Sequence, residues 1–444
     1  MFKKAALFFL VLALCEPDCG QARQETLSFT SSDRVLILAP HPDDETLGLG
    51  GMLQRLRASG AQVRILYLTH GESNEVASIF YQKRPLLWRS DFVKSGLTRK
   101  KEALGAMALL GFKAEELIFF GYPDGGLMNM WIKHWGEVSR PFRSLFTRFS
   151  RVPYKDNFSA GHVFKADEVV RDLERALLSF QPTAVFVTAP FDLNTDHQAA
   201  FLYAQVALRD LREQLMPPPS LYVYLVHAHH WPEPKKLQTD APLDVPTHID
   251  WGNEVAWKKF PLTDEETKKK VETLLQYKSQ LAYKKNFLLA FARKNELYAV
   301  YPAEKIQRIT GAEPGSGSFA DKALAGDVRY RVAGDELWIE IPFSSALDEM
   351  GVLSSYVFGY RSGFLFSDMP KFAFRLFGNK VFVYDGQKSF YDRKLIYRIE
   401  KDKLLIRLPL GILKEPEALF VSTRNAKEEL SLDFGAWKVL EIAP

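Results

Sequence analysis

The chain has very little cysteine: two of its 444 residues, Cys15 and Cys19, and both stand near the N-terminus. A chain with no cysteine beyond that point cannot rely on disulfide bonds. Long hydrophobic runs are scarce as well. The run Ala5–Leu14 is shorter than the roughly 20 residues that a membrane-spanning helix needs. Since no later stretch has this character, we predict no transmembrane segment once the N-terminal segment is removed.

The sequence also lacks a marked excess of charge of one sign. It has 58 Lys and Arg against 54 Asp and Glu, for a net charge of +4. Spread over 444 residues, this excess does not favour nucleic-acid binding, and it is compatible with an anionic glycan or an anionic membrane surface. Hydrophobic residues make up 47% of the chain, a folded and soluble composition, and the length favours two domains.

The N-terminus has the pattern of an export signal. Two lysines precede the apolar run Ala5–Leu14, and small residues follow at Gly20 and Ala22. We therefore predict a signal peptide over 1–22 and a periplasmic or extracellular location, with an ordinary buried strand as the other interpretation. Lipid anchoring at Cys15 is disfavoured, because the preceding leucine is bulky for a lipoprotein site.

From residue 33 to 301, short apolar runs alternate with stretches of helical spacing. The runs are rich in Val, Ile, Leu, Phe and Tyr on both faces, as in a sheet that is covered on both sides. This alternation predicts an α/β domain, a Rossmann-like and mainly parallel sheet with helices on both faces. The predicted strands are Val35–Ala39, Val63–Thr69, Leu117–Phe120, Ala184–Thr188 and Leu221–Val226.

Two long segments, 75–97 and 127–164, fit that alternation badly. Both are aromatic and basic, and long irregular loops in a compact domain are usually lids or binding walls. A local aromatic core is the equally weighted alternative. The aromatic residues concerned include Trp88, Trp131, Trp135 and Tyr154.

Residues 302–325 are rich in Pro, Gly and Ser, which predicts a linker. After it the pattern changes to short strands. Apolar residues alternate with other residues over 337–341, and two strand-like runs flank Gly378-Asn379. We therefore predict a small all-β, sandwich-like accessory domain over 326–444.

The segment after the first predicted strand carries the chemistry. His41, Asp43, Asp44 and Glu45 crowd the carboxyl end of that strand, where open α/β sheets bind ligands. Carboxylates this close repel one another, and a divalent cation relieves the repulsion. Capping of the next helix by acidic residues is the competing interpretation. Capping, however, requires no histidine.

A second polar fragment, 192–197, follows a later strand and ends in Asp196-His197. It can face the first fragment across the top of the sheet. His41, Asp44 and His197 would then supply three metal ligands and leave one position open, which is the arrangement of a catalytic zinc. Asp43 would be free to take a proton from water.

The segment Pro40-His41-Pro42-Asp43-Asp44-Glu45 resembles the signature of the PIG-L (LmbE-like) deacetylase family. Further motifs agree with that family in the same order along residues 33–301, whereas the β-rich region lies outside the resemblance. They are Leu68-Thr69-His70-Gly71-Glu72, Arg99-Lys100-Lys101-Glu102, Gly121-Tyr122-Pro123-Asp124-Gly125-Gly126-Leu127, Tyr277-Lys278-Ser279-Gln280 and Asn295-Glu296.

The resemblance implies a zinc-dependent hydrolase that removes the acetyl group from an N-acetylglucosamine-containing glycan or glycoconjugate. His41, Asp44 and His197 would bind the metal, usually zinc although another divalent ion is possible. Asp43 would act as general base towards water and then return the proton to the leaving amine. A glycan partner is expected, and nucleic acid is not.

Three further residues have two interpretations each. Asn194 stands where many members of that family have a histidine that assists the oxyanion; it is either a neutral hydrogen-bond donor or a turn residue. Arg99 holds a sugar hydroxyl or phosphate by resemblance, or is an ordinary ion-pair partner on a helix. Asp124 is a pocket residue by resemblance, or a turn former.

Four other histidines follow predicted strands. His70 is expected to be structural, near the site but outside it. His227, His229 and His230 follow a strand end, where they would line the mouth of the site or lie on the surface.

Three other functions make different demands on the sequence. A dinucleotide-binding enzyme needs a glycine-rich turn directly after the first strand, and here carboxylates occupy that turn. A non-catalytic glycan-binding protein on a deacetylase fold is supported by Asn194 and by the additional β domain. A metallo-amidase for another acyl amide would keep the same metal site.

Overall fold

The computed structural model describes residues 27–82, 87–246, 255–301, 304–306, 308–309, 328–342, 352–400, 402–426 and 436–443. The predicted signal peptide lies outside the described residues, as does most of the predicted linker. Within the part of the chain that is described, no helix combines the length and the apolar character needed to cross a membrane.

The first half of the chain forms a seven-stranded, mostly parallel sheet in the order β3-β2-β1-β4-β5-β7-β6. The first five strands are parallel to one another, and β7 runs antiparallel both to β5 and to the edge strand β6. The strands are β1 (Arg34–Ala39), β2 (Gln62–Thr69), β3 (Leu117–Tyr122), β4 (Ala184–Thr188), β5 (Ser220–Tyr224), β6 (Trp257–Pro261) and β7 (Asn295–Val300). The apolar runs therefore predicted the first five strands correctly.

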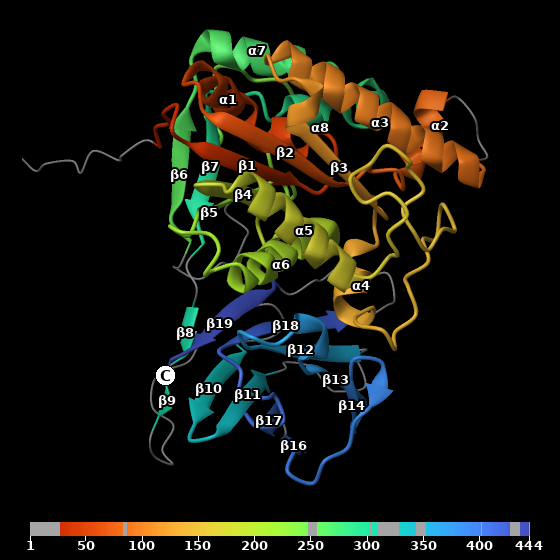
Figure 1. The fold of residues 1–444 in the computed structure, drawn as a ribbon, viewed down its shortest axis with the longest axis vertical. Coiled ribbons are helices and arrows are strands. Elements are labelled where there is room, and N and C mark those ends of the chain that lie inside the picture. The colour runs from red at the N-terminus through yellow and green to blue at the C-terminus, as the bar shows by residue number, and fades with distance from the viewer. Residues whose placement is uncertain are drawn as a thin grey trace, which may run out of the picture.

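Helices cover both faces of this sheet (Figure 1). One face carries α1 (Asp44–Ala58), α2 (Glu75–Gln82), α3 (Arg89–Leu109), α7 (Asp264–Leu274) and α8 (Lys278–Leu289). The opposite face carries α4 (Leu127–Lys133), α5 (Ala166–Phe180) and α6 (Thr195–Asp210). The mixed α/β architecture of this part is as predicted.

Two glycines let α1 approach its neighbours closely. A Cβ atom on Gly48 would lie 2.3 Å from the ring of Tyr224, and one on Gly51 would lie 2.3 Å from Leu262. Larger residues at either position would push α1 away from the sheet or from the adjacent segment. These glycines are therefore packing residues, consistent with the absence of a glycine-rich phosphate loop after β1.

The prediction of an irregular segment over 75–97 is wrong, because α2 and the start of α3 occupy most of it. Over 127–164, α4 is followed by irregular chain. Of the aromatic residues named there, Trp131, Trp135 and Tyr154 are buried. The aromatic-core interpretation is therefore the correct one for these three residues.

The C-terminal region contains two further β-sheets, with strand orders β16-β17-β11-β10-β9 and β15-β14-β13-β12-β18-β19-β8. Two short strands, β8 and β9, lie within the stretch expected to be a linker. The strands are β8 (Glu304–Ile306), β9 (Arg308–Ile309), β10 (Arg329–Ala333), β11 (Glu336–Pro342), β12 (Val352–Tyr360), β13 (Lys371–Phe377), β14 (Lys380–Asp385), β15 (Lys388–Ser389), β16 (Ile396–Ile399), β17 (Lys403–Pro409), β18 (Ala418–Ala426) and β19 (Lys438–Ile442).

The two C-terminal sheets share one hydrophobic cluster, to which Ile339 and Ile406 contribute from one sheet and Val357 and Phe374 from the other. A separate cluster joins the C-terminal region to the α/β part. Trp131 of α4 is fully buried among aromatic side chains of the C-terminal sheets and their loops. Its ring contacts Phe358, Phe366, Phe420 and Trp437, with centroid separations of 5.3–5.9 Å.

Candidate metal centre

The order in which successive strands are added to the parallel sheet reverses between β1 and β4, and a loop follows each of these two strands. Strands β1 and β4 are adjacent, and their chains continue into α1 and α6. In open α/β sheets the crevice outside the carboxyl ends of such strands is the usual ligand site. The loop after β1 carries His41 and Asp43, and the loop after β4 leads to Asn194 and His197.

Three donor atoms from these two loops converge on one point. Nδ1 of His41 and Nε2 of His197 each lie 3.1 Å from the same oxygen of Asp44, and they lie 3.2 Å from each other. Donor atoms at the usual distance from one tetrahedral zinc ion are roughly 3.3 Å apart. His41, Asp44 and His197 are all buried. These donors therefore fit a single metal ion at the predicted position.

The second nitrogen of each imidazole also faces a carboxylate. Nε2 of His41 lies 3.1 Å from Asp124, and Nδ1 of His197 lies 3.1 Å from Asp192. Such partners fix the tautomer and the ring orientation of metal-binding histidines. Asp192 is a site residue that the sequence analysis missed, although it stands five positions before His197 in the fragment that was singled out.

The electrostatics also favour a cation at this point. Although burial opposes protonation, the carboxylates of Asp192 and Asp44 raise the pKa of His197 to about 9. The pKa of His41 is likewise raised well above its usual value, since nearby carboxylates, foremost Asp124, outweigh its burial. The site thus holds positive charge between these carboxylates, and a metal ion would supply that charge in place of protons.

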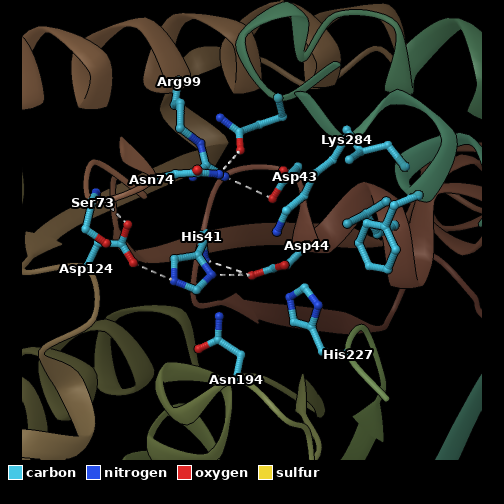
Figure 2. Close-up of a pocket in the computed structure, with 14 residues that line it drawn as sticks. His41, Asp43, Asp44, Ser73, Asn74, Arg99, Asp124, Asn194, His227 and Lys284 are labelled. Atoms are coloured by element: carbon cyan, nitrogen blue, oxygen red, sulfur yellow. Dashed lines mark hydrogen bonds and ion pairs between the residues drawn. The ribbon is translucent and has the colours of Figure 1, made fainter. Parts of the chain in front are cut away.

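Asp43 stands at the entrance to α1 with φ of 126°, an unusual backbone conformation for a residue other than glycine. Burial raises the pKa of its carboxyl group to about 7, against the opposing effect of the Arg99 charge. Figure 2 shows this carboxylate in the pocket that His41 and Asp44 also line. A carboxyl group with a pKa near neutrality can both accept and release a proton.

Arg99 of α3 is buried and holds the loop that contains Asp43. Its guanidinium donates to the carbonyl oxygens of Gly71 and Pro42, at 2.8 and 2.7 Å, and to Asp43 at 3.1 Å. It also lines the pocket (Figure 2). These contacts add a positioning role to the two interpretations drawn from the sequence.

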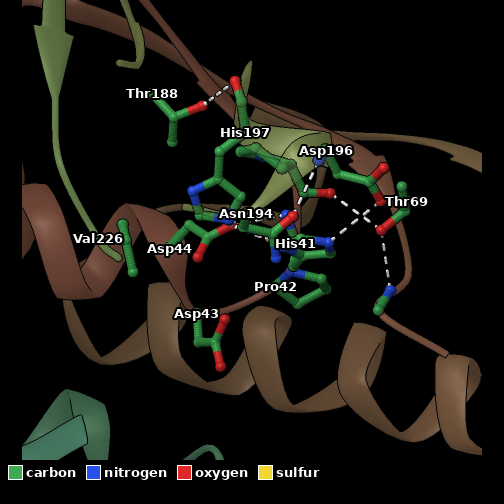
Figure 3. Close-up of polar contacts among 12 residues, drawn as sticks. His41, Pro42, Asp43, Asp44, Thr69, Thr188, Asn194, Asp196, His197 and Val226 are labelled. Atoms are coloured by element: carbon green, nitrogen blue, oxygen red, sulfur yellow. Dashed lines mark hydrogen bonds and ion pairs between the residues drawn. The ribbon is translucent and has the colours of Figure 1, made fainter. Parts of the chain in front are cut away.

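Asn194 caps the N-terminus of α6. Its side-chain oxygen accepts a hydrogen bond of 2.9 Å from the backbone N–H of Asp196 (Figure 3). The NH₂ group is the donor of this side chain, and the residue also lines the pocket. Asp196 in turn accepts hydrogen bonds from the backbone of Gly125 and Leu127, and so joins α6 to the Pro-Asp-Gly turn.

Glu45, the last acidic residue of the motif, does not line the pocket. Its carboxylate accepts hydrogen bonds from Thr46, from the hydroxyl of Tyr277 and from the backbone of Asp43. It is fully buried. Glu45 therefore fixes the loop, and the hydrogen bond from Tyr277 fastens α8 to it.

The four other histidines that follow predicted strands lie in different surroundings. His70 is buried, stacks on Tyr154 at 4.0 Å and contacts Asn157, and its pKa is lowered to about 3, chiefly by burial. It is outside the pocket, as expected. His227 lines the pocket and stacks on Phe287, whereas His229 and His230 are exposed.

The pocket itself is a cavity of about 220 Å³. His41, Asp44, Asp43 and Asp124 line one side of it, and α8 lines another (Figure 2). Lys284 and Phe287 stand on that side, together with Gln280. The pocket thus places polar groups around the candidate metal position and an apolar surface opposite.

Comparison with known proteins agrees with this geometry. The family model described as GlcNAc-PI de-N-acetylase, PIG-L, matches residues 36–208. Two relatives are 1D-myo-inositol 2-acetamido-2-deoxy-alpha-D-glucopyranoside deacetylases. That of Geodermatophilus obscurus is 37% identical over 104 residues, 22% of this chain and 34% of the relative. That of Rhodococcus erythropolis is 46% identical over 101 residues, 22% of this chain and 33% of the relative.

The chain therefore spans about a third of the length of these relatives. Among solved structures, a conserved protein of Thermus thermophilus is 24% identical, with a TM-score of 0.34, over 58% of this chain and 84% of that one. The region matched by the family model contains most of β1, all of β4 and all three donors of the candidate metal centre. Residues 36–208 therefore form a PIG-L family domain.

Proposed function

We propose that this protein is a zinc-dependent deacetylase that hydrolyses the acetamide of an N-acetylglucosamine-containing glycan or glycoconjugate. The observation that carries the proposal is the convergence of His41, Asp44 and His197 on one point, with a spacing that suits zinc. Asp43, which the metal does not need as a ligand, lines the same pocket as His41 and Asp44. Three ligands with an adjacent base are the parts of a hydrolytic metal site.

A bound zinc ion would supply Lewis acidity, which polarises the amide carbonyl and lowers the pKa of water. Asp43 removes a proton from the attacking water and later gives it to the departing amine, so that acetate and a free amino sugar result. Arg99 keeps the Asp43 carboxylate in place through the contact of 3.1 Å. The pKa of Asp43, raised to about 7 by burial, suits both proton transfers.

Other pocket residues bind and orient the substrate. The amide NH₂ of Asn194 is available to donate to the oxygen of the carbonyl as negative charge develops there. Asp124 lines the pocket and accepts a hydrogen bond of 2.7 Å from the backbone of Ser73. Phe287 offers an apolar face to a sugar ring, and Gln280 and Asn74 offer hydrogen bonds to its hydroxyl groups.

The substrate class rests on the family description and on the relatives, whose names refer to an acetamido sugar. The export pattern at the N-terminus leads us to propose a periplasmic or extracellular glycan as the natural substrate. An anionic or neutral glycan is compatible with the near balance of charge in the chain.

The experiment is to measure acetate release from a panel of N-acetylglucosamine oligosaccharides and glycolipids. Wild type, Asp43→Asn and a control at an exposed position, Asp240→Asn, are assayed after zinc loading, and bound zinc is counted by mass spectrometry. We expect wild type and the control to release acetate, chelator to abolish the release, and Asp43→Asn to bind zinc but lose activity by about 10²-fold or more. A zinc-loaded wild type that hydrolyses no acetamido sugar would refute the proposal.

A further inference from the structure

A second cavity lies in the C-terminal region, between the edges of its two sheets. It has a volume of about 500 Å³ and is lined by β14, by β16 and by the connection that runs from β15 to β16. β15 ends the seven-stranded sheet beside β14, and β16 ends the five-stranded sheet. Figure 1 shows β14 and β16 in the part of the molecule away from the parallel sheet, and this cavity shares no lining residue with the pocket of the candidate metal centre.

Aromatic side chains at this cavity are unusually exposed. Tyr391 is 86% exposed, and Phe382 and Tyr397 are each 46% exposed. Phe390 and Leu395 are more deeply placed in the same cavity. Large apolar surfaces gathered at a hollow, rather than scattered singly, are typical of a binding site. Tyrosine is well suited to such a place, since its ring is apolar and its hydroxyl group is polar.

The connection between β15 and β16 is also positively charged. It carries Arg393 and Lys394 and follows Lys388 of β15, against Asp392, whose side chain accepts a hydrogen bond from the backbone of Lys394. Among the described residues, no carboxylate forms an ion pair with these three cations. A hollow with exposed rings and unpaired cations beside it is complementary to a ligand that combines flat apolar faces with negative charge.

We propose that this cavity binds an acidic carbohydrate chain, with the faces of its sugar rings on the tyrosines and its carboxylate or phosphate groups on Arg393, which lines the cavity. The C–H face of a pyranose ring matches an aromatic ring in size and polarity. Ser389 and Asp392, which also line the cavity, supply hydrogen bonds to hydroxyl groups. A membrane surface fits less well, because it would require the rings to project from a protruding surface, and here they surround a hollow.

This site goes beyond the proposed deacetylase function and does not depend on it. If both are correct, the cavity would tether a polymer and raise the local concentration of acetamido groups near the metal centre. The two proposals are therefore tested separately. Binding is measured with the Asp43→Asn variant, so that no hydrolysis accompanies it, and failure of the acetate assay would leave the binding result unaffected.

The probe is a hyaluronan hexasaccharide, in which N-acetylglucosamine alternates with glucuronate, titrated calorimetrically into the full chain. A neutral chitin hexasaccharide is the matched ligand. The matched variants are Tyr391→Ala/Tyr397→Ala, at the cavity, and Phe377→Ala, an aromatic residue that is 62% exposed and does not line it. All three substitutions replace exposed side chains, so the fold is expected to persist.

We expect the acidic hexasaccharide to bind more tightly than the neutral one, with a Kd that rises as salt is added. The double variant should weaken binding about tenfold or more, since aromatic anchors carry most of the affinity of such sites, and Phe377→Ala should leave it unchanged. Equal binding by the double variant and the control would refute the proposal. So would binding of anionic lipid vesicles or of an extended peptide to this surface in place of the hexasaccharide.

Discussion

The backbone N–H of Trp437 donates a hydrogen bond of 3.3 Å to the carbonyl oxygen of Pro190. Trp437 precedes the C-terminal strand β19, and Pro190 begins the loop that leads from β4 to His197. The C-terminal sheets thus touch the loop that carries part of the candidate metal centre. Trp131 is buried between the same two parts. The C-terminal region and the α/β part therefore share a hydrophobic core.

Replacement of Trp131 by alanine should therefore destabilise the whole chain. The side chain is fully buried against rings from both parts, and loss of such a residue costs about 3–5 kcal/mol. Chemical unfolding, followed by far-UV circular dichroism, measures the loss. The control is Trp88→Ala, at a position that is 70% exposed, which should change the free energy of unfolding by less than about 0.5 kcal/mol. Equal effects of the two substitutions would contradict the shared core.

Asp192 should control the affinity of the metal centre without touching the metal. One of its oxygens lies 3.1 Å from Nδ1 of His197 and accepts hydrogen bonds from the backbone of Val226 and His227. We expect Asp192→Asn to lower zinc affinity about 10- to 100-fold, as for other carboxylates behind a ligating histidine. Competition with a chromophoric chelator gives the affinity.

The control for this experiment is Asp264→Asn, an exposed position in the first turn of α7. It should bind zinc as the wild type does. If Asp192→Asn also retains the affinity of the wild type, the contact between Asp192 and His197 does not contribute to zinc binding. The ligand set proposed for zinc would then have to be revised.

The sequence allowed the strands and the convergence of His41, Asp44 and His197 to be predicted for a shared reason. Buried strands such as β1 and β4 are short apolar runs, and the polar residues that follow them cannot be explained by packing. The beginning of α3 was missed because its buried face carries Ser95, Gly96 and Arg99, none of which is a large apolar residue, and Arg99 lines the pocket. Hydrophobic periodicity disappears where a helix contributes to a polar site.

Contacts between distant segments could not be predicted from the sequence, for a different reason. Nothing in the segment around Trp131 shows that rings near residues 358–366 and 420–437 complete its surroundings. Likewise, Tyr277 reaches Glu45 from 232 positions away. Such pairs are set by how the helices and sheets pack, whereas the spacing of residues along one segment reports only on that segment.

Asn194 allows its two interpretations to be separated. As the cap of α6 it accepts a hydrogen bond, and as a pocket residue it can donate one. Asn194→Ser retains a capping oxygen but cannot reach as far with a donor, so stability should persist while kcat falls about 10²-fold. Asn194→Ala should lower the free energy of unfolding by about 1 kcal/mol as well. An unchanged kcat for Asn194→Ser in the acetate assay would show that Asn194 acts as a helix cap and takes no part in the reaction.

The last prediction concerns pH and a lysine at the contact between the two parts. Lys371 is buried, with its ammonium group 4.7 Å from the ring of Trp135 and 4.3 Å from that of Phe366. Burial lowers the pKa of Lys371 to about 7, from 10.5 as the ordinary value. Between these values the unfolded chain binds a proton that the folded chain does not, so this lysine makes stability rise with pH through that window. Below pH 7 both states are charged, and the full cost of burying the charge is present.

Lys371→Met removes the titrating group and should flatten this part of the pH dependence. The gain in stability of the variant relative to wild type should be largest below pH 7 and should shrink steadily as pH approaches 10.5. Loss of the hydrogen bond of 2.9 Å to the carbonyl of Met369 adds a cost, but one that does not vary with pH. Urea unfolding at intervals from pH 6 to 10 measures the difference, with the exposed Lys380→Met as control. A difference between wild type and Lys371→Met that stays constant over this range would show that the lysine remains charged in the folded state, held by the two rings and the carbonyls around it.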